Sequence, residues 1–589
     1  MASHDIFLLF LASGVLGILT ISLSITFDTI GRVYSQQAQV IIASRPHNVT
    51  EPSDTVPTAA PINNLTHTHI ITESTNTTLG TELEHQNDWT TANHDIFGSR
   101  NSNQTIIGKD NVNKLHIKWI LPSEFVIEDA PVIVGHTGFV QDNGGNVIAF
   151  GTKTGLVLWK LHLGTGGNMH GLTYDHGILY SGTGHNATTV AMNSTNGAII
   201  WQSLVLGPSK EGYSVATPPI VWKDYVIVGS AGGDFPPEKG VVQGNITALN
   251  RTNGKIIWNF RTTTGDWVSP GKSPPNGGAT AWSGGSYDPQ TGMLYLPLGN
   301  PTPNYNASNR LTPELYANHM VALDIKSGKL IWATPFIAEG TVLKVRIPDT
   351  HDWDTSWGSS VTSVTFDNGT HRKIVIGHDK MGNIIAMDAA TGKEIWWKTM
   401  GNEHNVDTIP QPKGSGLVWT YGIDSYHAVD NNNTLYITTN GRGLNFFSYG
   451  LSGYRLPIAK SIELGYSNGT ITAVDMRTGA IKWEYKVNFP PLVSPLVSEG
   501  MLFSGYIPFV EKQTTSTKFG HVTTSTHQIR TGVILALDIR SGHLIWKSTV
   551  PGPIGVGGPS IGDGMLLVPT GKFQSSKGVG GSLVAFGLE

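Results

Sequence analysis

The 589-residue chain contains no cysteine, and only 14% of its residues are charged. The absence of thiols excludes disulfide bonds, thiolate metal sites and covalently attached c-type haem, because each of these needs cysteine. The formal net charge of −4 gives no electrostatic reason to expect a nucleic-acid partner. What the chain has in abundance is glycine (70 residues) and tryptophan (16 residues). Low charge with many glycines and aromatics favours an all-β protein with tight turns.

The first apolar run of the chain is Ile6–Phe27, which contains no charged residue. It is long enough to cross a bilayer as a helix, and longer than the apolar region of a usual signal peptide. We therefore predict an uncleaved membrane anchor within residues 1–35, with cleavage near Ala38 as the alternative. No lysine or arginine precedes the run, so loop charge does not decide its orientation.

A polar tract rich in Thr, Asn, Ser and His occupies residues 36–87. Such a tract buries too little apolar surface to offset the entropy of ordering, so we predict a flexible stalk. Glycosylation sequons of the form N-x-S/T occur here and beyond. Together with the apolar start they favour an exported glycoprotein, on the extracellular or periplasmic side of the membrane. These sequons include Asn48, Asn64, Asn76, Asn103, Asn186, Asn245 and Asn468.

One phrase recurs through residues 88–589, as in "VALDIKSGKLIW", "IAMDAATGKEIW" and "LALDIRSGHLIW". Each copy has an apolar run with Ala, a turn ending in Gly, and a second run with Trp four residues after the Gly. Two apolar runs joined by such a turn predict a β-hairpin, and its irregular recurrence predicts the blades of a propeller. The seven repeat tryptophans are Trp159, Trp201, Trp258, Trp332, Trp396, Trp483 and Trp546.

The two ends of this region supply an eighth blade. The chain finishes with "GSLVAFGLE", which lacks a Trp strand, whereas "NKLHIKWI" near the start has Trp119 and no preceding partner. Joining them would close an eight-bladed ring and leave no unpaired sheet edge. We interpret all eight tryptophans as packing between neighbouring blades, without a catalytic role.

The repeats resemble the tryptophan-docking repeats of quinoprotein alcohol dehydrogenases, which hold pyrroloquinoline quinone (PQQ) on the axis of an eight-bladed propeller. The resemblance covers nearly all of residues 88–589, beginning with "DWTTANHDIFGSRNSNQTIIGKDNVNKLHIKW" and "IEDAPVIV". Non-catalytic scaffolds of outer-membrane assembly share the repeat, so the enzyme hypothesis depends on the residues of the site.

Two stretches resemble the family's metal and cofactor segments. In "VGSAGGDFPPEKGVVQGNITALN", Asp234 occupies the position of the acidic metal ligand, where the family more often has Glu. In "GGATAWSGGSYDPQTGMLYLPLGNPTPNYN", Trp282 matches the tryptophan that stacks on the cofactor, and Asn300 matches a metal ligand. The alternative for Trp282 is a packed blade residue.

A third stretch, "DTHDWDTSWG", corresponds to the family segment that carries the catalytic base. One alignment makes Asp354 the base and Asp352 its supporting acid. A second alignment, to the lanthanide-using branch, makes Asp352 the base and Asp354 an extra metal ligand. Both carboxylates would lie on one face of a strand, so geometry permits either assignment. The alternative is a polar loop between blades.

The remaining cofactor contacts come from scattered positions. Lys380, in "IVIGHDKMGNIIAMD", matches the basic residue that hydrogen-bonds the quinone oxygens, and Glu128 matches an acid that hydrogen-bonds the cofactor. Trp419 begins a stretch that should carry another contact. His170 stands where an Arg is usual, and the family's adjacent cysteine pair is absent.

The resemblance implies a membrane-anchored dehydrogenase that uses PQQ with Ca²⁺ or a lanthanide to oxidise an alcohol or a sugar. A hard cation bound by oxygen ligands acts as a Lewis acid, a carboxylate removes the substrate proton, and a cation such as Lys380 stabilises the developing oxyanion. Electrons would pass to a separate acceptor, a cytochrome or copper protein. The alternative functions are a non-catalytic cell-surface scaffold or binding module, and a sugar-binding propeller with exposed aromatics on one rim.

Overall fold

The computed structural model describes most of the region after residue 87 and none of the residues before it. The described residues are 88–164, 171–184, 187–204, 206–207, 213–232, 243–262, 279–299, 316–336, 355–380, 382–400, 415–420, 422–440, 444–450, 468–489, 491–518, 521–571 and 580–588. The predicted anchor and stalk therefore lie outside them. Within this part of the chain, no helix has the length and apolar character needed to span a membrane.

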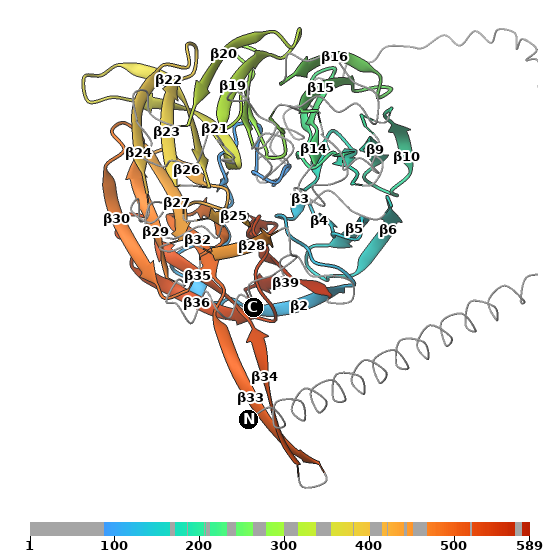
Figure 1. The fold of residues 1–589 in the computed structure, drawn as a ribbon, viewed down its shortest axis with the longest axis vertical. Coiled ribbons are helices and arrows are strands. Elements are labelled where there is room, and N and C mark those ends of the chain that lie inside the picture. Colours follow the sequence, from blue (N-terminus) through green and yellow to red (C-terminus); the bar gives the residue numbers. More distant parts are fainter. Residues whose placement is uncertain are drawn as a thin grey trace, which may run out of the picture. The chain divides into compact units, whose positions relative to one another are not determined.

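The described residues form eight antiparallel sheets of four principal strands each, arranged as a ring of blades (Figure 1). The first four blades, written from the inner to the outer strand, are β3 (Val132–Val134), β4 (Thr137–Gln141), β5 (Asn146–Gly151) and β6 (Val157–His162); β7 (Thr173–Asp175), β8 (Ile178–Gly182), β9 (Thr189–Asn193) and β10 (Ile199–Gln202); β12 (Ile220–Trp222), β13 (Tyr225–Gly229), β15 (Asn245–Asn250) and β16 (Ile256–Arg261); and β17 (Ser286–Asp288), β18 (Met293–Leu298), β19 (His319–Asp324) and β20 (Leu330–Pro335).

Blades 5 to 8 follow the same order. They are β21 (Thr355–Thr365), β22 (His371–Asp379), β23 (Asn383–Asp388) and β24 (Glu394–Thr399); β26 (Ala428–Asp430), β27 (Thr434–Asn440), β29 (Gly469–Asp475) and β30 (Ile481–Val487); β31 (Val493–Ser498), β32 (Met501–Tyr506), β35 (Gly532–Asp538) and β36 (Leu544–Val550); and β37 (Ser560–Gly562), β38 (Met565–Thr570), β39 (Gly581–Gly587) and β2 (His116–Ser123).

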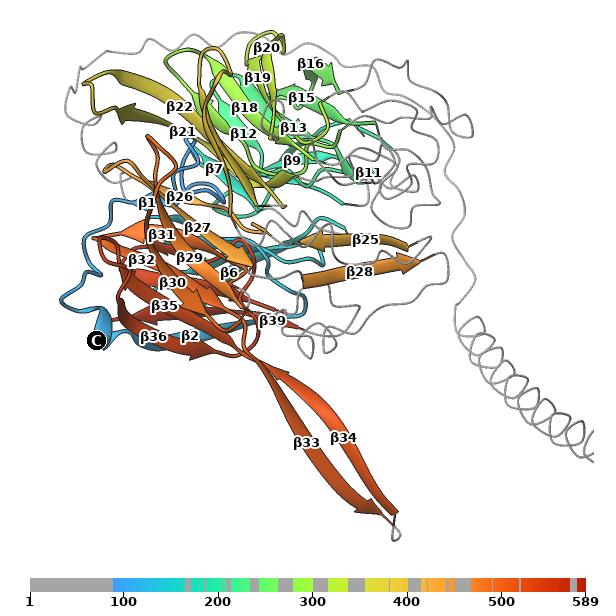
Figure 2. The ribbon, with the colours of Figure 1, turned by 60° about the vertical axis from the view of Figure 1, so that its left-hand side comes forward.

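A few short elements lie outside this pattern. Strand β1 (Asn101–Ser102) adds to the inner edge of blade 7, and η1 (Val112–Lys114) is a single 3₁₀ turn. The hairpin β33 (Phe509–Lys518) and β34 (His521–Arg530) extends away from the ring (Figure 2). The remaining strands pair two by two: β11 (Tyr213–Ser214) with β14 (Ala231–Gly232), and β25 (Ser415–Thr420) with β28 (Leu444–Gly450).

The ring closes as the sequence predicts. Strand β2, from the start of the region, pairs antiparallel with β39, from its end, and Trp119 lies opposite Ala585. Because the last blade takes strands from both ends of the chain, the ring has no open seam there.

The repeated tryptophans join each blade to the next. In seven blades the indole N–H donates to a backbone carbonyl in the following blade's outer turn, at 2.7–3.0 Å. The ring lies against the turn glycine of that blade, whose φ is 67–72°. Glycine is needed there because a Cβ would be strained and would overlap the indole. The pairs are Trp119 with Gly155, Trp159 with Gly197, Trp201 with Gly254, Trp258 with Gly328, Trp332 with Gly392, Trp396 with Gly479 and Trp483 with Gly542.

The eighth tryptophan has no such glycine, because the blade that follows it is the one closed by β2. Trp546 instead packs edge-on against Phe586, with the ring centroids 5.5 Å apart. All eight tryptophans therefore have the packing role that the repeat predicts.

Residues 89–102, which we call the axial segment, run along the inner strands of the blades (Figure 1, blue). Their backbone exchanges hydrogen bonds of 2.7–3.0 Å with blades 1, 2, 4, 5, 6 and 7. The blade residues in these bonds are Ile133, Tyr174, Tyr287, Val361, Val429 and Val497. The axial segment therefore ties together blades that are distant in the sequence.

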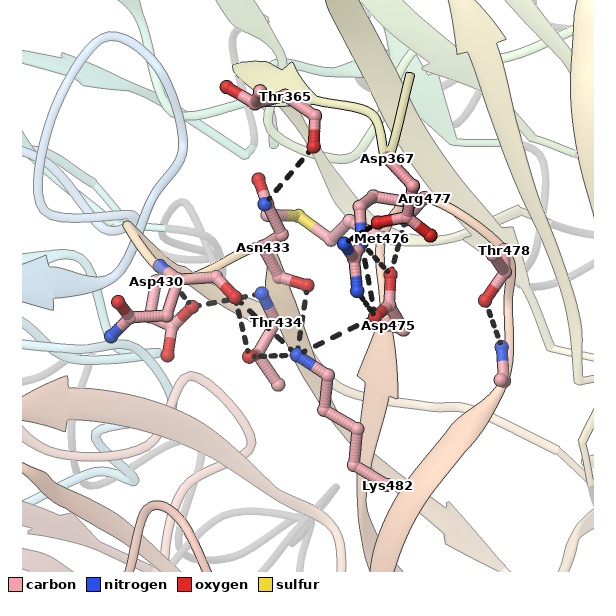
Figure 3. A network of polar contacts seen from close by, with 12 residues as sticks. Thr365, Asp367, Asp430, Asn433, Thr434, Asp475, Met476, Arg477, Thr478 and Lys482 are labelled. Carbon is pink, nitrogen blue, oxygen red and sulfur yellow. Dashed lines mark hydrogen bonds and ion pairs between the residues drawn. The ribbon is translucent and has the colours of Figure 1, made fainter. Parts of the chain in front are cut away.

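Ion pairs between blades add a polar layer near the inner turns. Figure 3 shows the network between blades 5 and 6, where Arg477 donates to Asp475 at 2.6–3.2 Å and also reaches Asp367 of the preceding blade. Lys482 donates to the Thr434 hydroxyl at 2.8 Å. A largely exposed pair such as Arg477–Asp367 stabilises a fold by about 0–1 kcal/mol, so the docked tryptophans and the buried core dominate.

One of the predicted sequons does not fit the fold. Asn245 lies in β15 with 6% of its surface exposed, and its amide donates to the Gln243 carbonyl at 3.0 Å. A glycan needs an accessible asparagine, so the prediction is wrong at this position. Asn103 and Asn468 are exposed, whereas Asn48, Asn64, Asn76 and Asn186 lie outside the described residues.

Candidate active site at one end of the axis

The inner strands run along the axis of the propeller, so residues at the start and at the end of such a strand lie at opposite ends of the axis. In blade 4, Trp282 precedes β17 and Asp288 ends it. In blade 5, β22 runs the opposite way, with Lys373 near its start and Lys380 just after its end. Trp282 contacts Lys380, and Asp288 contacts Lys373. We name the two ends of the axis the Trp282 end and the Asp288 end.

An aromatic ring and a cation meet at the Trp282 end. The Lys380 ammonium lies 4.6 Å from the centroid of the Trp282 ring, over its face. The same ammonium is 3.9 Å from Oδ1 of Asp424, a buried carboxylate in the loop before β26. Three consecutive blades, 4 to 6, therefore contribute a flat apolar face, a positive charge and a carboxylate to one place.

Beneath Trp282 lies a small apolar cluster built from the starts of several blades. It contains Ala216 before β12, Tyr426 before β26, Val556 before β37 and Ala92 of the axial segment. Trp282 itself is only 9% exposed. This packing fixes the plane of the indole, as a stacking residue requires.

Arg100 supports the cluster from the axial segment. Its side chain is fully buried and donates to three backbone carbonyls, those of Ala92, Pro495 and Pro559, at 2.7–3.1 Å. Its guanidinium also lies 5.6 Å from the Tyr426 ring centroid. Burial lowers the pKa of Arg100 to about 10, so the side chain stays charged at neutral pH. Arg100 thus places a permanent cation on the axis. A buried charge of this kind needs compensating partners.

Asp129 is a buried carboxyl close to this cation. Burial raises the pKa of Asp129 to about 7, although the Ala130 N–H and the charge of Arg100 act in the opposite direction. Its Oδ2 has no hydrogen-bond partner among the described residues. A Cβ at Gly171 or Gly557 would lie 2.2–2.3 Å from this carboxyl group, so only glycine fits at either position.

Two buried histidines form a directional chain in blades 5 and 6. The Ser360 hydroxyl donates to the Gly98 carbonyl at 2.5 Å, so it accepts the Nε2–H of His427 at 2.6 Å. His427 Nδ1 then accepts from His378 Nε2 at 2.8 Å. Burial lowers the pKa of His427 to about 3 and that of His378 well below its ordinary value, so both rings are neutral. The chain fixes the tautomer of His378, two residues before Lys380.

The structure describes only part of the predicted site. It brings Trp282 and Lys380 together. It buries Glu128 in the entry to blade 1, where the Glu128 carbonyl accepts from the Gly557 N–H at 2.8 Å. Trp419 lies in β25, where its backbone pairs with Asn445; its side chain lies outside the described part. Five further predicted residues lie outside the described residues: His170, Asp234, Asn300, Asp352 and Asp354.

The described residues contain no group of three or more His, Cys, Asp or Glu side chains that could hold a metal ion. All four predicted metal ligands fall outside that part of the chain, so the metal site stays a prediction. Strand β21 begins at Thr355, directly after Asp354.

The sequence motifs did not identify several residues that lie at this end. Asp424 lies in the stretch "LVWTYGIDSYHAV", whose register could not be fixed, and Asp129 follows Glu128 in "IEDAP". Arg100 and the His378–His427 pair had no recognisable signal, because their partners are far away in the sequence.

The residues present fit PQQ, a flat polyanion. The Trp282 ring is held in a fixed plane, and the cation beside its face belongs to the residue that matches the family's quinone-binding position. A cation over an aromatic face attracts planar anions by electrostatics while the ring supplies stacking area.

Two family models match the chain. The one described as "Outer membrane protein assembly factor BamB" matches residues 101–269 and 317–498. The one described as "Glucose/ethanol/alcohol dehydrogenase, beta-propeller domain" matches residues 194–400. Both matches lie in the propeller, and the first covers more than half of the chain.

Curated relatives are similar over the same region. Quinoprotein alcohol dehydrogenase PedH of Pseudomonas putida is 27% identical over 338 residues, which are 51% of this chain and 53% of the relative. Putative dehydrogenase XoxF of Paracoccus denitrificans is 27% identical over 373 residues, 57% of each chain. The chain spans about half the length of the curated relatives it matches.

Solved structures share the fold at low identity. A europium-containing methanol dehydrogenase superposes with a TM-score of 0.64 at 19% identity, over 86% of this chain and 99% of that one. Quinohemoprotein alcohol dehydrogenase from Comamonas testosteroni gives 0.63 at 17% identity, over 85% and 80%. With eight docked blades and these matches, the chain belongs to the family of PQQ-type β-propellers related to quinoprotein alcohol dehydrogenases.

Proposed function

We propose that this chain is a PQQ- and metal-dependent dehydrogenase that oxidises an alcohol or a sugar and passes the electrons to a separate acceptor. The observation that carries the proposal is the position of the Lys380 ammonium, 4.6 Å over the buried Trp282 ring at one end of the axis. Two residues from different blades, matched independently to a stacking tryptophan and a quinone-binding cation, lie in contact.

Each residue has a defined role in this proposal. Bound PQQ supplies the two-electron acceptor for the alcohol carbon. Trp282 offers a fixed plane for stacking, Lys380 gives positive charge and hydrogen-bond donors to ligand oxygens, and Asp424 orients Lys380. Glu128, His170 and Trp419 complete the cofactor contacts.

The metal and the base come from residues outside the described part. Asp234 and Asn300 supply oxygen ligands for Ca²⁺ or a lanthanide. Asp354 removes the proton of the substrate hydroxyl, with Asp352 as its supporting acid. In the second register Asp352 is the base and Asp354 a metal ligand.

The proposal includes an exported enzyme held at the membrane by residues 6–27. Support comes from the length and apolar character of that segment. A chain without cysteine cannot attach a c-type haem, so the acceptor is a separate cytochrome or copper protein.

A non-catalytic scaffold or binding module is the second candidate. It is favoured by the longer of the two family matches, which is to an assembly-factor model. The two candidates differ in whether the Trp282 end binds a cofactor.

The test is reconstitution of the purified chain with PQQ and either Ca²⁺ or a lanthanide. We expect quinone absorbance that co-purifies with the protein and reduction of an electron-accepting dye in the presence of alcohols. Lys380→Ala should strongly weaken both, whereas Lys393→Ala, which removes an exposed lysine of the same blade, should not. A parent protein that binds no PQQ with any metal would favour the scaffold.

A further inference from the structure

A cavity of about 460 Å³ lies at the Asp288 end, opposite the proposed active site. Its walls come from blades 4, 5 and 6 and from the axial segment. This volume is within the range of about 300–1,000 Å³ that is usual for small-molecule sites. Lys373, which lines the cavity, and Lys380 lie seven residues apart along β22 and its end, so roughly 20 Å of strand separates the two ends.

The charged groups of blades 4 and 5 in this cavity neutralise one another. Lys373 donates to both oxygens of Asp288 at 2.8 Å and to Oε1 of Gln290 at 2.9 Å. These three bonds use all three hydrogens of the ammonium group. The Asp288 carboxylate also accepts from the Thr291 hydroxyl at 2.7 Å. Neither charge is left to recognise an ionic ligand.

The two other carboxylates each accept at least three hydrogen bonds from nearby residues of the chain. Asp95 accepts from the N–H groups of Phe97 and Ser99 at 3.0 Å and from the Ser99 hydroxyl at 2.6 Å. Asp430 (Figure 3) accepts from the N–H groups of Asn432 and Thr434 and from the Tyr436 hydroxyl, at 2.8–2.9 Å. These bonds hold the walls in shape and occupy most of the acceptor sites of the two carboxylates.

Apart from His94, whose Nδ1 lies 3.3 Å from Asp95 Oδ2, the hydrogen-bonding capacity that remains in the cavity comes from neutral side chains. Several amide and hydroxyl side chains line it, and none of them forms a side-chain hydrogen bond within the described residues. They are Asn101, Asn103, Thr362, Ser363 and Asn431. Amides and hydroxyls both donate and accept, as do the hydroxyl groups of a sugar.

One aromatic ring lies among these polar groups. Phe97 of the axial segment lines the cavity and is 40% exposed, so its ring is accessible to a ligand in the cavity. Its backbone is fixed, because the Phe97 carbonyl accepts from the Val361 N–H at 3.0 Å. An exposed aromatic ring beside uncharged donors and acceptors is complementary to the two kinds of surface of a pyranose: an apolar C–H face and a rim of hydroxyls.

We propose that this cavity is a binding site for a neutral saccharide, with Phe97 under the sugar ring and the amide and hydroxyl side chains around its hydroxyl groups. The site is separate from the proposed oxidation site and needs neither PQQ nor a metal ion. It gives the propeller a means to hold a glycan at one end of its axis.

The test is saturation-transfer difference NMR on the full chain without PQQ or added metal, with maltose, cellobiose and diacetylchitobiose as probes. We expect at least one of these neutral disaccharides to bind. Phe97→Ala should weaken binding about tenfold, since an aromatic contact is worth roughly a kcal/mol. Ile106→Ala, which truncates an exposed side chain outside the cavity, should leave binding unchanged.

Asn431→Ala and Ser363→Ala test the polar side of the site without disturbing the axial segment. Each should weaken binding about threefold to tenfold, the usual range for one lost hydrogen bond. Loss of sugar binding in Lys380→Ala would place the sugar at the Trp282 end and overturn the proposal. The proposal is overturned if no probe binds, if Phe97→Ala binds like the parent, or if only anionic saccharides bind in a salt-sensitive way.

Discussion

The two ends of the propeller axis differ in how they surround a lysine of the same blade. At the Asp288 end, Lys373 is fixed by both oxygens of Asp288 at 2.8 Å. At the other end of β22, Lys380 lies 4.6 Å over the Trp282 ring, with the Asp424 carboxylate at 3.9 Å. One lysine forms a close ion pair that stabilises the wall of a cavity, and the other stands beside an aromatic face. The two ends of β22 therefore place their lysines in different surroundings, an ion pair at one end and an aromatic face at the other.

The predictions below separate these roles, beginning with the largest effect. Asp354→Asn should lower turnover about 100- to 10,000-fold, because proton removal by a positioned base typically contributes that much. Metal and PQQ binding should persist. Asp352→Asn should act through the metal or the orientation of Asp354 and should recover in part with excess cation. Steady-state kinetics over a range of metal concentrations measures both variants. The reverse pattern would establish the register in which Asp352 is the base.

Lys380→Ala should lower turnover about 100- to 1,000-fold, since it removes a cation that stabilises developing negative charge. Lys380→Arg should recover much of the activity, because it keeps the charge over Trp282. Equal loss in Lys380→Ala and Lys393→Ala would show that the position is not special. Dye reduction at saturating alcohol is the measurement.

Arg100→Met should lower the free energy of unfolding by about 3–5 kcal/mol, because it leaves three buried carbonyls without their donor and Asp129 without a nearby cation. Urea denaturation followed by tryptophan fluorescence measures the change. Arg372→Met removes an exposed arginine and should cost less than about 0.5 kcal/mol. Similar midpoints for the two variants would contradict a central role for the axial segment.

Gly392→Ala should destabilise the fold by about 1–3 kcal/mol, because φ is +71° and the new Cβ would lie 2.5 Å from the Trp332 ring. Gly369→Ala is the matched control: its φ is +75°, but a Cβ there meets nothing within 4 Å. The difference between the two variants isolates the tryptophan contact from backbone strain. No difference would mean that the indoles do not dock as described.

Asp129 should give the fold a pH dependence of stability. Burial raises its pKa from 3.8 to about 7, so the fold keeps a proton that the unfolded chain loses. Its contribution to stability is full below about pH 4 and is lost as pH rises through about 7. Asp129→Asn cannot lose a proton, so its stability relative to the parent should increase between pH 4 and pH 8. Urea unfolding across this range tests the sign, and a constant difference would contradict it.

The sequence predicted the ring because its signal is local and repeated. Each Gly and the Trp four residues later mark the same hairpin, and the incomplete repeats at the two ends predicted that β2 and β39 pair. The axial segment was not predicted, since its hydrogen bonds to the blades are made by the backbone and leave no side-chain pattern. Likewise, Asp288 and Lys373 are 85 residues apart, and neither was matched to a functional position of the family.

The candidate site was predictable only where the family motif names a residue. Trp282 and Lys380 matched motif positions, and the structure brings them into contact. Asp424 depended on a register that the sequence did not determine. The buried cation Arg100 gains its importance from carbonyls 395 and 459 residues away, which no local pattern encodes.

The measurement that tests the central claim most directly is equilibrium binding of PQQ, in the presence of Ca²⁺ or a lanthanide, to the parent chain, Lys380→Ala and Lys393→Ala. We predict saturable binding to the parent and to Lys393→Ala, accompanied by quenching of tryptophan fluorescence, and strongly weakened binding to Lys380→Ala. Equal affinity in all three proteins, or no binding to the parent with any metal, would contradict the assignment of the Trp282 end as the cofactor site.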